Sequence, residues 1–303
     1  MSRSPDPLIG IVTVLYNSDK VLEDFFTSLA AQENVHYRLY VIDNGTTDSG
    51  SRLSRELAQA HGIAAVCVFN NANVGVAKGN NQGIELALAD GCTHVLLANN
   101  DTAFSPATIW RLMEPLFDDA EQVSVPKIMY HGEPTKLWYG GSHINAWLMR
   151  TPHHELKQLD RGQTDGIRHV SYAPTCFMML DARIFDRVGR MDEQYFVYYD
   201  DTDFVWRMCA AGLRIRYVPA SVVMHKVSTS TGGELSPFSL YYTNRNRIYF
   251  IRKNLRGPQR WIAMAYMMVT RIPRLSLLPK ALASRGWRGV VDGWRMAMPG
   301  RET

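Results

Sequence analysis

The sequence predicts an α/β fold in which a mixed, mainly parallel sheet is flanked by helices. In the first 101 residues, short runs rich in β-branched side chains alternate with stretches of helical periodicity. Polar residues end each of these runs, as expected where strands of a parallel sheet open onto a ligand site. With 303 residues and 46% hydrophobic content, the chain is long enough to bury a large core.

The first elements follow one another in a strand–helix order. Residues 9–16 (IGIVTVLY) and 38–44 (RLYVIDN) have the composition of buried strands. Between them, apolar side chains recur at helical spacing at Val21, Leu22, Phe25, Phe26 and Leu29. After the second strand, Thr47 or Asp48 is placed to cap the next helix.

Two more units complete the first half. Residues 63–69 predict a third strand, followed by a Gly-rich turn and a helix that ends near residue 89. Residues 94–101 (HVLLANND) predict a fourth, buried strand. We expect the ligand site beyond these strands, at Thr13 to Asn17, Asp43 and Asn44, Asn70 to Asn80, and Asn99 to Asp101.

The second half is less regular. Between about 120 and 180 the pattern loosens into shorter strands and loops rich in Gly and His, which we expect to form an acceptor side that includes Trp138 and Gly140. A helix is predicted from Asp200 to Gly212. Two strands (213–219 and 221–227) and a long amphipathic helix (237–255) are predicted to follow.

The chain contains no internal repeat and no low-complexity linker. We therefore expect one catalytic domain, 1–256, with a helical extension, 257–303. Within the domain, the boundary between the strand–helix half and the less regular half falls near residue 120, which gives 1–120 and 121–256.

The distribution of charge and the cysteine content indicate which partner surface and which cellular compartment suit the protein. Residues 245–303 carry thirteen Lys or Arg against two acids, a local charge of +11, so the rest sums to −7 within the total of +4. A basic tail on an acidic body favours an anionic membrane over nucleic acid as partner, because no nucleic-acid motif is present. Four scattered cysteines, a polar N-terminus and no long apolar run predict a cytoplasmic protein, peripheral on the inner face of the bacterial plasma membrane.

Asp101 ends a buried strand, where an ionised carboxylate needs a cation or strong hydrogen-bond donors. Asn99 and Asn100 add neutral oxygen ligands that suit Mg²⁺ or Mn²⁺. His225, at the end of an apolar run, is a further candidate metal ligand, although an isolated histidine is more often structural. The alternative for Asp101 is a cap on a helix that begins near Pro106.

Three acids, Asp200, Asp201 and Asp203, stand among aromatic residues in YFVYYDDTDFVW. Mutual repulsion and apolar surroundings raise carboxyl pKa values, which favours a role as general base. The alternative is the negative first turn of a helix. The segment NVGVAKGNNQG (73–83) places bare backbone at a strand-to-helix junction, suited to a phosphate or a sugar; its glycines would equally allow close helix packing.

Six segments in order resemble the inverting family 2 glycosyltransferases of the GT-A fold, in their bacterial rhamnosyl- and galactofuranosyltransferase-like branch. The segments are VTVLYN (12–17), VIDNGTTDSG (41–50), NANVGVAKGNNQGI (71–84), LLANNDT (96–102), the stretch from CFMMLD to RMCAAG (176–212), and HKVS (225–228). The first acid of the family's DxD motif is Asn99 here, and the family's Glu-Asp pair is Asp200-Asp201.

The resemblance implies a role for each matching residue. The metal site would be Asp101 and His225, and the catalytic base Asp201 with Asp200 beside it. Residues 1–120 would then be the nucleotide-sugar half and 121–256 the acceptor and catalytic half. Trp138 and Gly140, which lie outside the six segments, are expected on the acceptor side together with Asp203 and Trp206. Nucleotide-sugar contacts would come from Thr13, Tyr16, Asn17, Asp43, Asn44, Asn73, Gly75, Lys78, Gly79, Asn80, Asn99 and Asn100.

The activity implied is a single displacement that inverts the anomeric carbon, assisted by Mg²⁺ or Mn²⁺. The expected donor is dTDP-rhamnose, with UDP-galactofuranose or another UDP-hexose as alternatives, and the expected acceptor is a cell-surface or lipid-linked glycan. A non-catalytic nucleotide-sugar-binding module is the rival interpretation. The basic tail would contact an anionic membrane, or pack on the catalytic domain or on a second subunit in a homodimer.

Overall fold

The computed structural model describes residues 7–151, 153, 155–227 and 235–299. The N-terminal residues 1–6, Ser228 of the HKVS segment and the last four residues of the tail therefore lie outside the described residues. The sheet contains ten strands, eight of them along the order β3-β2-β1-β4-β9-β6-β10-β5, with β7 paired to β6 and β8 to β10.

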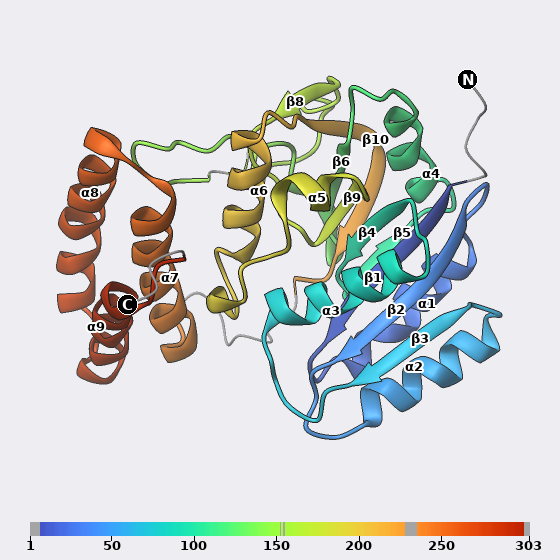
Figure 1. Ribbon diagram of the computed structural model, residues 1–303, viewed down its shortest axis with the longest axis horizontal. Coiled ribbons are helices and arrows are strands. Elements are labelled where there is room, and N and C mark those ends of the chain that lie inside the picture. Colours follow the sequence, from blue (N-terminus) through green and yellow to red (C-terminus); the bar gives the residue numbers. More distant parts are fainter. Residues whose placement is uncertain (1–6, 152, 154, 228–234, 300–303) are drawn as a thin grey trace.

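The first half follows the predicted strand–helix alternation. Its elements are β1 (Leu8–Leu15), α1 (Leu22–Ala30), β2 (His36–Asp43), α2 (Ser49–Ala60), β3 (Ala65–Phe69), α3 (Val76–Ala89) and β4 (His94–Ala98). Strands β1 to β4 are parallel to one another, so their carboxyl ends share one edge of the sheet. In Figure 1 the arrows of β2 and β3 run toward the left, where the C-terminal helices stand.

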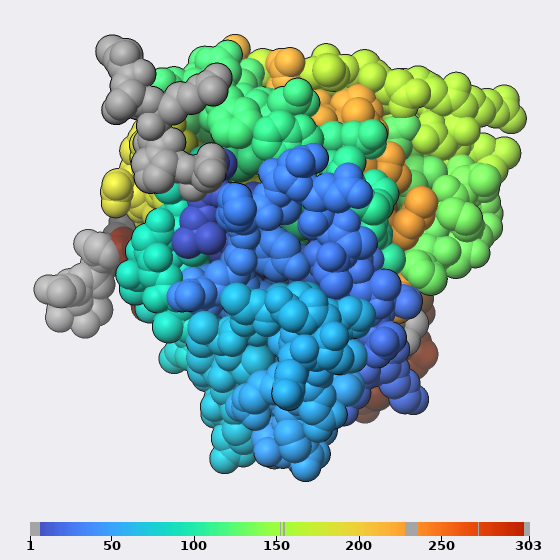
Figure 2. All heavy atoms as spheres, turned by 90° about the vertical axis from the view of Figure 1, so that its right-hand side faces the viewer, coloured from blue at the N-terminus to red at the C-terminus, as the bar shows by residue number. Residues whose placement is uncertain are grey.

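The second half adds antiparallel strands, which makes the sheet mixed as predicted. Its elements are β5 (Thr102–Phe104), α4 (Thr108–Met113), β6 (Val123–Tyr130), β7 (Glu133–Tyr139), β8 (Arg168–Val170), β9 (Phe177–Asp181), α5 (Ile184–Val188), α6 (Asp200–Ala210) and β10 (Ile215–His225). Figure 2 shows the face opposite the C-terminal helices, built mainly from the blue-to-green N-terminal half of the chain.

One prediction in this half was wrong. The two strands expected at 213–219 and 221–227 form the single strand β10, which pairs with β6 on both sides of a register shift between Val218 and Val222. Pro219 lies inside the shift, and a proline without an N–H is tolerated in a central strand at such a bulge. The strand therefore continues past the residue that interrupts its pattern.

Three helices close the chain: α7 (Pro237–Asn254), α8 (Gly257–Ser276) and α9 (Lys280–Arg295). They share a second hydrophobic cluster, which includes Ile248, Phe250 and Met267, separate from the core of the sheet. Helix α9 lies close against α7 because it presents glycines: a Cβ on Gly289 or Gly293 would stand 2.3 or 2.4 Å from a backbone oxygen of α7. Among the described residues, no helix combines the length and apolar character needed to span a bilayer.

Candidate active site

Asp43, at the end of β2, holds the loop that follows it. Its carboxylate accepts hydrogen bonds from the N–H groups of Gly45 (2.8 Å) and Ser51 (2.7 Å) and from the Ser51 hydroxyl (2.9 Å). The expected cap at Thr47 or Asp48 was wrong: Asp48 is the N-cap residue of α2 but its side chain makes no capping bond. Asp43 instead accepts the hydrogen bond from the N–H of Ser51 in the first turn of α2, eight residues away. The shape of the loop and the start of α2 therefore both depend on Asp43, the residue expected to face the nucleotide base.

The end of β1 presents three of the predicted donor-site residues. Thr13 is fully buried, and its hydroxyl has no hydrogen-bond partner among the described residues. Tyr16 is 40% exposed, and Asn17 is exposed with a φ of 52°. At the neighbouring end of β4, Asn99 is exposed, while the Asn100 amide donates to the carbonyl of Val14 at 2.7 Å.

The Gly-rich segment divides into a loop and a packing face. Gly75 has a φ of 88°, and a Cβ there would lie 2.6 Å from the carbonyl oxygen of Phe196. Asn44 donates to the Gly75 carbonyl (3.0 Å), and the Asn73 side chain accepts from the Gly75 N–H (3.1 Å). These bonds fix the loop that opens α3.

After Gly75, the glycines of this segment allow close packing of α3, which was the alternative interpretation of the segment. A Cβ on Gly79 would stand 2.8 Å from Val14, which shows that α3 lies directly on β1 at this point. Asn80 is buried and its amide faces the sulfur of Met191 at 3.6 Å, so it is directed away from the loop. Lys78 is exposed in the first turn of α3.

The predicted metal ligands meet at the carboxyl edge of the sheet. Strand β5 pairs with β10 so that Thr102 lies opposite His225, which brings Asp101 beside the imidazole. The Asp101 Oδ1 and His225 Nε2 atoms are 3.1 Å apart, and both side chains are buried. The helix-cap alternative is excluded, because α4 begins at Thr108 after Ala107 and no side chain caps it.

This pair fits a small divalent cation. Two ligands at right angles on an octahedral ion, each about 2.1 Å from it, stand about 3.0 Å apart, which matches the Asp101–His225 separation. The Nδ1 of His225 is buried without a hydrogen-bond partner in the described structure. No group of three His, Cys, Asp or Glu side chains converges among the described residues, so other ligands would come from the bound substrate and water.

The predicted catalytic pair begins α6. Both carboxylate oxygens of Asp201 accept a hydrogen bond, which fixes the direction of the side chain. Oδ1 accepts from the Thr202 N–H (2.6 Å) and Oδ2 from the Tyr172 hydroxyl (2.7 Å). Asp200 is buried beside it, and burial together with the charge of Asp201 raises the pKa of Asp200 to about 7. One carboxylate is thus held in a fixed direction while its neighbour favours the protonated form.

Two residues expected on the acceptor side lie elsewhere. Asp203 is fully buried, where it pairs with Arg207 (2.8 Å) and Lys253 (2.8 Å). Burial alone would raise the pKa of Asp203, but these two cations hold it below its ordinary value. Trp206 packs edge-to-face on Phe250 of α7, with ring centroids 5.8 Å apart. Both side chains therefore join α6 to the C-terminal helices, because every third or fourth residue of α6 faces that side.

An aromatic wall joins the metal pair to the catalytic pair. The Trp138 ring meets His225 (4.8 Å between centroids) and His153 (5.0 Å), and His153 in turn lies 6.0 Å from Tyr172, whose hydroxyl bonds Asp201. Gly140, two residues after Trp138, is buried against Thr164.

His153 and Tyr172 were absent from the predicted site. Neither lies in a recognisable motif, and only the tertiary fold brings them to the wall.

The backbone before Asp200 is held in an unusual conformation. Phe196, Tyr198 and Tyr199 all have φ between 61° and 65°, a region that side chains with a Cβ rarely occupy. The buried amide of Asn246, on α7, donates to the carbonyls of Tyr195 (2.8 Å), Val197 (2.7 Å) and Tyr198 (2.8 Å). Residues 196–199, the strained segment, are thus fixed by a residue that the sequence pattern did not single out.

The strained segment also meets the donor loop. The Phe196 carbonyl accepts from the N–H of Val76 at 2.7 Å, one residue after Gly75. The loop expected to contact the nucleotide and the turn that leads into Asp201 are therefore one connected structure.

Solved structures share this arrangement of sheet and helices. A mannosyltransferase from Pyrobaculum calidifontis, solved with GDP-Man and Mn²⁺, matches with a TM-score of 0.59 at 14% identity, over 98% of this chain and 79% of that one. GalNAc-T7, solved with UDP, GalNAc and Mn²⁺, matches with a TM-score of 0.60 at 12% identity, over 92% of this chain and 59% of that one. The fold is GT-A.

The chain belongs to glycosyl transferase family 2, whose family model matches residues 10–189. Among its relatives is a dTDP-rhamnosyl transferase of Shigella flexneri, 26% identical over 81% of this chain and 80% of the relative. An N-acetylglucosaminyl-diphospho-decaprenol L-rhamnosyltransferase of Mycobacterium tuberculosis is 25% identical over 84% of this chain and 88% of its own length. The predicted family, fold and rhamnosyltransferase branch are confirmed.

Proposed function

We propose that this glycosyltransferase moves rhamnose from dTDP-rhamnose to a hydroxyl of a cell-surface or lipid-linked glycan, with inversion at the anomeric carbon. The observation that carries the proposal is the wall of Trp138, His153 and Tyr172, which has the Asp101–His225 pair at one end and Asp201 at the other. This arrangement supports a reaction in which the leaving diphosphate would be held at one end of the wall and the proton would be accepted at the other.

In the proposed reaction, Asp201 accepts the proton of the acceptor hydroxyl while that oxygen attacks the anomeric carbon. The bond between the anomeric carbon and the phosphate oxygen breaks, and its electron pair leaves with the nucleoside diphosphate. Asp101 and His225 would hold a divalent cation, which supplies charge neutralisation on the departing diphosphate. Tyr172 and Thr202 keep the Asp201 carboxylate directed at the acceptor.

The donor is assigned by relatedness. The Shigella relative is named for dTDP-rhamnosyl transfer and the mycobacterial relative for L-rhamnosyl transfer, which supports dTDP-rhamnose. UDP-galactofuranose or another UDP-hexose is the alternative within the same fold. The buried Asp43, with the ends of β1 and β4 beside it, would form the nucleoside pocket.

The acceptor is assigned to lipid-linked or cell-surface glycans for two reasons. The mycobacterial relative is named for a diphospho-decaprenol substrate. Helix α8 also exposes an apolar stripe, Trp261 (68% exposed), Val269 (73%) and Leu277 just after its end (86%). At 3.6 residues per turn, successive members of this set are turned about 80° from each other, so these exposed apolar side chains spread around about half of the helix circumference.

We propose that this stripe rests on an anionic membrane, on the inner face of the bacterial plasma membrane, with residues 257–303 as a distinct extension of the catalytic domain 1–256. Pairing with a second copy to form a homodimer is the alternative use of the same surface.

The test is a calorimetric titration of the protein with dTDP and with UDP, each with and without Mn²⁺, repeated on Asp101→Asn. The proposal predicts tighter binding of dTDP than of UDP, a gain in affinity with Mn²⁺, and loss of that gain in the variant. Equal affinity for both nucleotides would refute dTDP as the donor nucleotide. Absence of binding to either would contradict the proposed function.

A further inference from the structure

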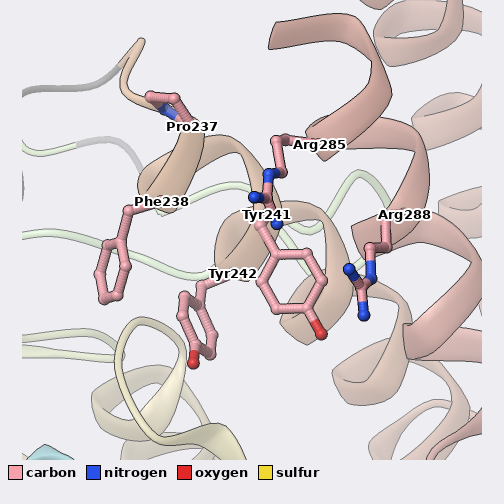
Figure 3. A pocket seen from close by; sticks show the side chains of 6 residues that line it. All are labelled: Pro237, Phe238, Tyr241, Tyr242, Arg285 and Arg288. Carbon is pink, nitrogen blue, oxygen red and sulfur yellow. The ribbon is translucent and has the colours of Figure 1, made fainter. Parts of the chain in front are cut away.

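A pocket of about 430 Å³ opens between α7 and α9. Figure 3 shows its aromatic side chains, all from the first two turns of α7, and two arginines that reach toward them from α9. The lining residues are Pro237, Phe238, Tyr241, Tyr242, Arg285 and Arg288. The predicted and proposed nucleotide-sugar sites include none of them.

The pocket is strongly cationic. Arg285 is exposed and makes no hydrogen bond or ion pair among the described residues. Arg288 reaches only Asp292, at 3.6 Å, and that carboxylate already accepts a hydrogen bond from Tyr241 (2.8 Å). Two guanidinium groups on one side of a small pocket, three residues apart on one helix, fit an anion with several oxygens.

The opposite side of the pocket is aromatic. The Phe238 and Tyr242 rings lie 4.7 Å apart and the Tyr241 and Tyr242 rings 5.0 Å apart, and Phe238 is 38% exposed. Aromatic faces bind hydrocarbon without needing hydrogen bonds from it. The pocket therefore suits a ligand in which an apolar chain joins directly to an anionic group.

The pocket borders the catalytic segment. The Tyr242 ring stacks on Phe196, with centroids 5.1 Å apart and planes 19° apart. The Tyr198 hydroxyl lies 2.9 Å from the Ser239 hydroxyl, in the first turn of α7. Phe196 and Tyr198 belong to the strained segment that runs into Asp200 and Asp201, so the pocket wall adjoins the segment that leads to the proposed base.

We propose that this pocket binds the diphosphate of an isoprenoid diphosphate acceptor. Arg285 and Arg288 would contact the phosphate oxygens, and Phe238, Tyr241 and Tyr242 the first isoprene units. This inference rests on the proposed function, in which the acceptor is lipid-linked, and it adds the site that selects the diphosphate. A glycan without the diphosphate would offer neither guanidinium group an anionic ligand.

The probe is farnesyl diphosphate, titrated into the full-length protein while intrinsic fluorescence or heat is recorded. Removing both charge-assisted contacts in Arg285→Gln/Arg288→Gln should weaken binding by about tenfold or more. Farnesol and inorganic pyrophosphate, each carrying one half of the ligand, should bind the wild-type protein more weakly than farnesyl diphosphate. The control is Arg274→Gln, which removes an exposed charge of α8 outside the pocket.

Unchanged affinity in the double variant would overturn the proposal, as would an equal loss in Arg274→Gln, because the arginines would then act only through general charge. Equal binding of farnesol would show an apolar site without diphosphate recognition, and would also contradict it. Titration with dTDP separates this question from the proposed function: the double variant should bind dTDP as the wild type does. A wild type that binds farnesyl diphosphate but not dTDP would refute the donor assignment alone.

Discussion

Asp200 and Asp201 are neighbours in sequence, but their surroundings differ. Asp201 is half-buried and accepts hydrogen bonds from Tyr172 and Thr202, so its direction is fixed. Asp200 is buried without comparable donors from other side chains among the described residues. The raised pKa of Asp200 therefore favours a neutral side chain next to the proposed base.

The first prediction concerns the pH dependence of stability. The pKa of Asp200 is raised from 3.8 to about 7, so the folded protein holds a proton there that the unfolded chain has lost. That contribution to the free energy of unfolding is complete below pH 3.8 and is lost as the pH rises through about 7. Asp200→Asn keeps a neutral side chain, and should gain about 3 kcal/mol relative to wild type between pH 5 and pH 8.5.

Urea unfolding at the two pH values measures this difference. Asp186→Asn, at an exposed position of α5, is the control and should follow the wild type. Parallel pH profiles for wild type and Asp200→Asn would show that Asp200 is already ionised in the folded protein at pH 5.

At the scale of elements, the strained segment connects three parts of the protein. It receives hydrogen bonds from Asn246 of α7, contacts the Gly75 loop through Phe196, and leads into α6. Three residues with positive φ persist only where their surroundings hold them. The C-terminal helices therefore take part in positioning the base as well as in packing.

The second prediction tests that role. Asn246→Ala removes a donor from three backbone carbonyls. Among the described residues, the carbonyls of Val197 and Tyr198 have no other donor, so the turn before Asp201 should relax. The Tyr195 carbonyl keeps its bonds from Arg245 and from the Val197 N–H. Displacement of the base by a fraction of an ångström to one ångström should lower kcat about ten- to hundredfold. The KM for the donor should change much less, because Asn246 does not face the proposed nucleotide site.

Asn244→Ala is the matched control. Asn244 is equally buried on α7, but its amide donates only to Leu240 within its own helix. Both variants should lose stability, and only Asn246→Ala should lose kcat. An equal fall in kcat for the two would mean that the loss reflects general destabilisation of α7.

The sequence predicted those elements whose pattern is local. Strands β1 to β4, helices α1 to α3 and helix α6 follow from periodicity within a few residues, and each lies where it was expected. Features that depend on distant pairing were missed. Asp43 accepts a hydrogen bond from the first turn of α2, eight residues away. Tyr172 donates to Asp201, 29 residues away, and Asn246 donates to the Tyr198 carbonyl, 48 residues away. Asp203 was misplaced because its partner Lys253 lies on another helix.

At the scale of the whole molecule, the carboxyl edge of the sheet faces the C-terminal helices (Figure 1). The metal pair, the base and the α7–α9 pocket thus belong to one side of the protein. The exposed stripe of α8 lies on these same helices. A membrane-bound acceptor would need such a layout, because its reacting hydroxyl must reach the base while its lipid stays at the bilayer.

The third prediction concerns that membrane contact. Trp261→Ser/Val269→Ser removes two exposed apolar side chains from α8, and should reduce sedimentation with anionic vesicles several-fold. Binding of dTDP should be unaffected, since neither residue lies near the sheet edge. Ile167→Ser, at a position 61% exposed in the second half of the chain, is the control and should sediment as the wild type. Undiminished sedimentation of the α8 variant would rule out the stripe as the contact.

The assignment of Asp201 as the base is the centre of the account. The most direct measurement is sugar transfer by Asp201→Asn, followed as release of dTDP from dTDP-rhamnose with acceptor, beside calorimetric binding of dTDP to the same protein. Asparagine keeps the shape of the side chain but cannot take up the proton of the acceptor hydroxyl. We predict a fall in turnover of about a thousandfold with dTDP affinity unchanged. Turnover close to that of the wild type would contradict the account and move the base to another residue.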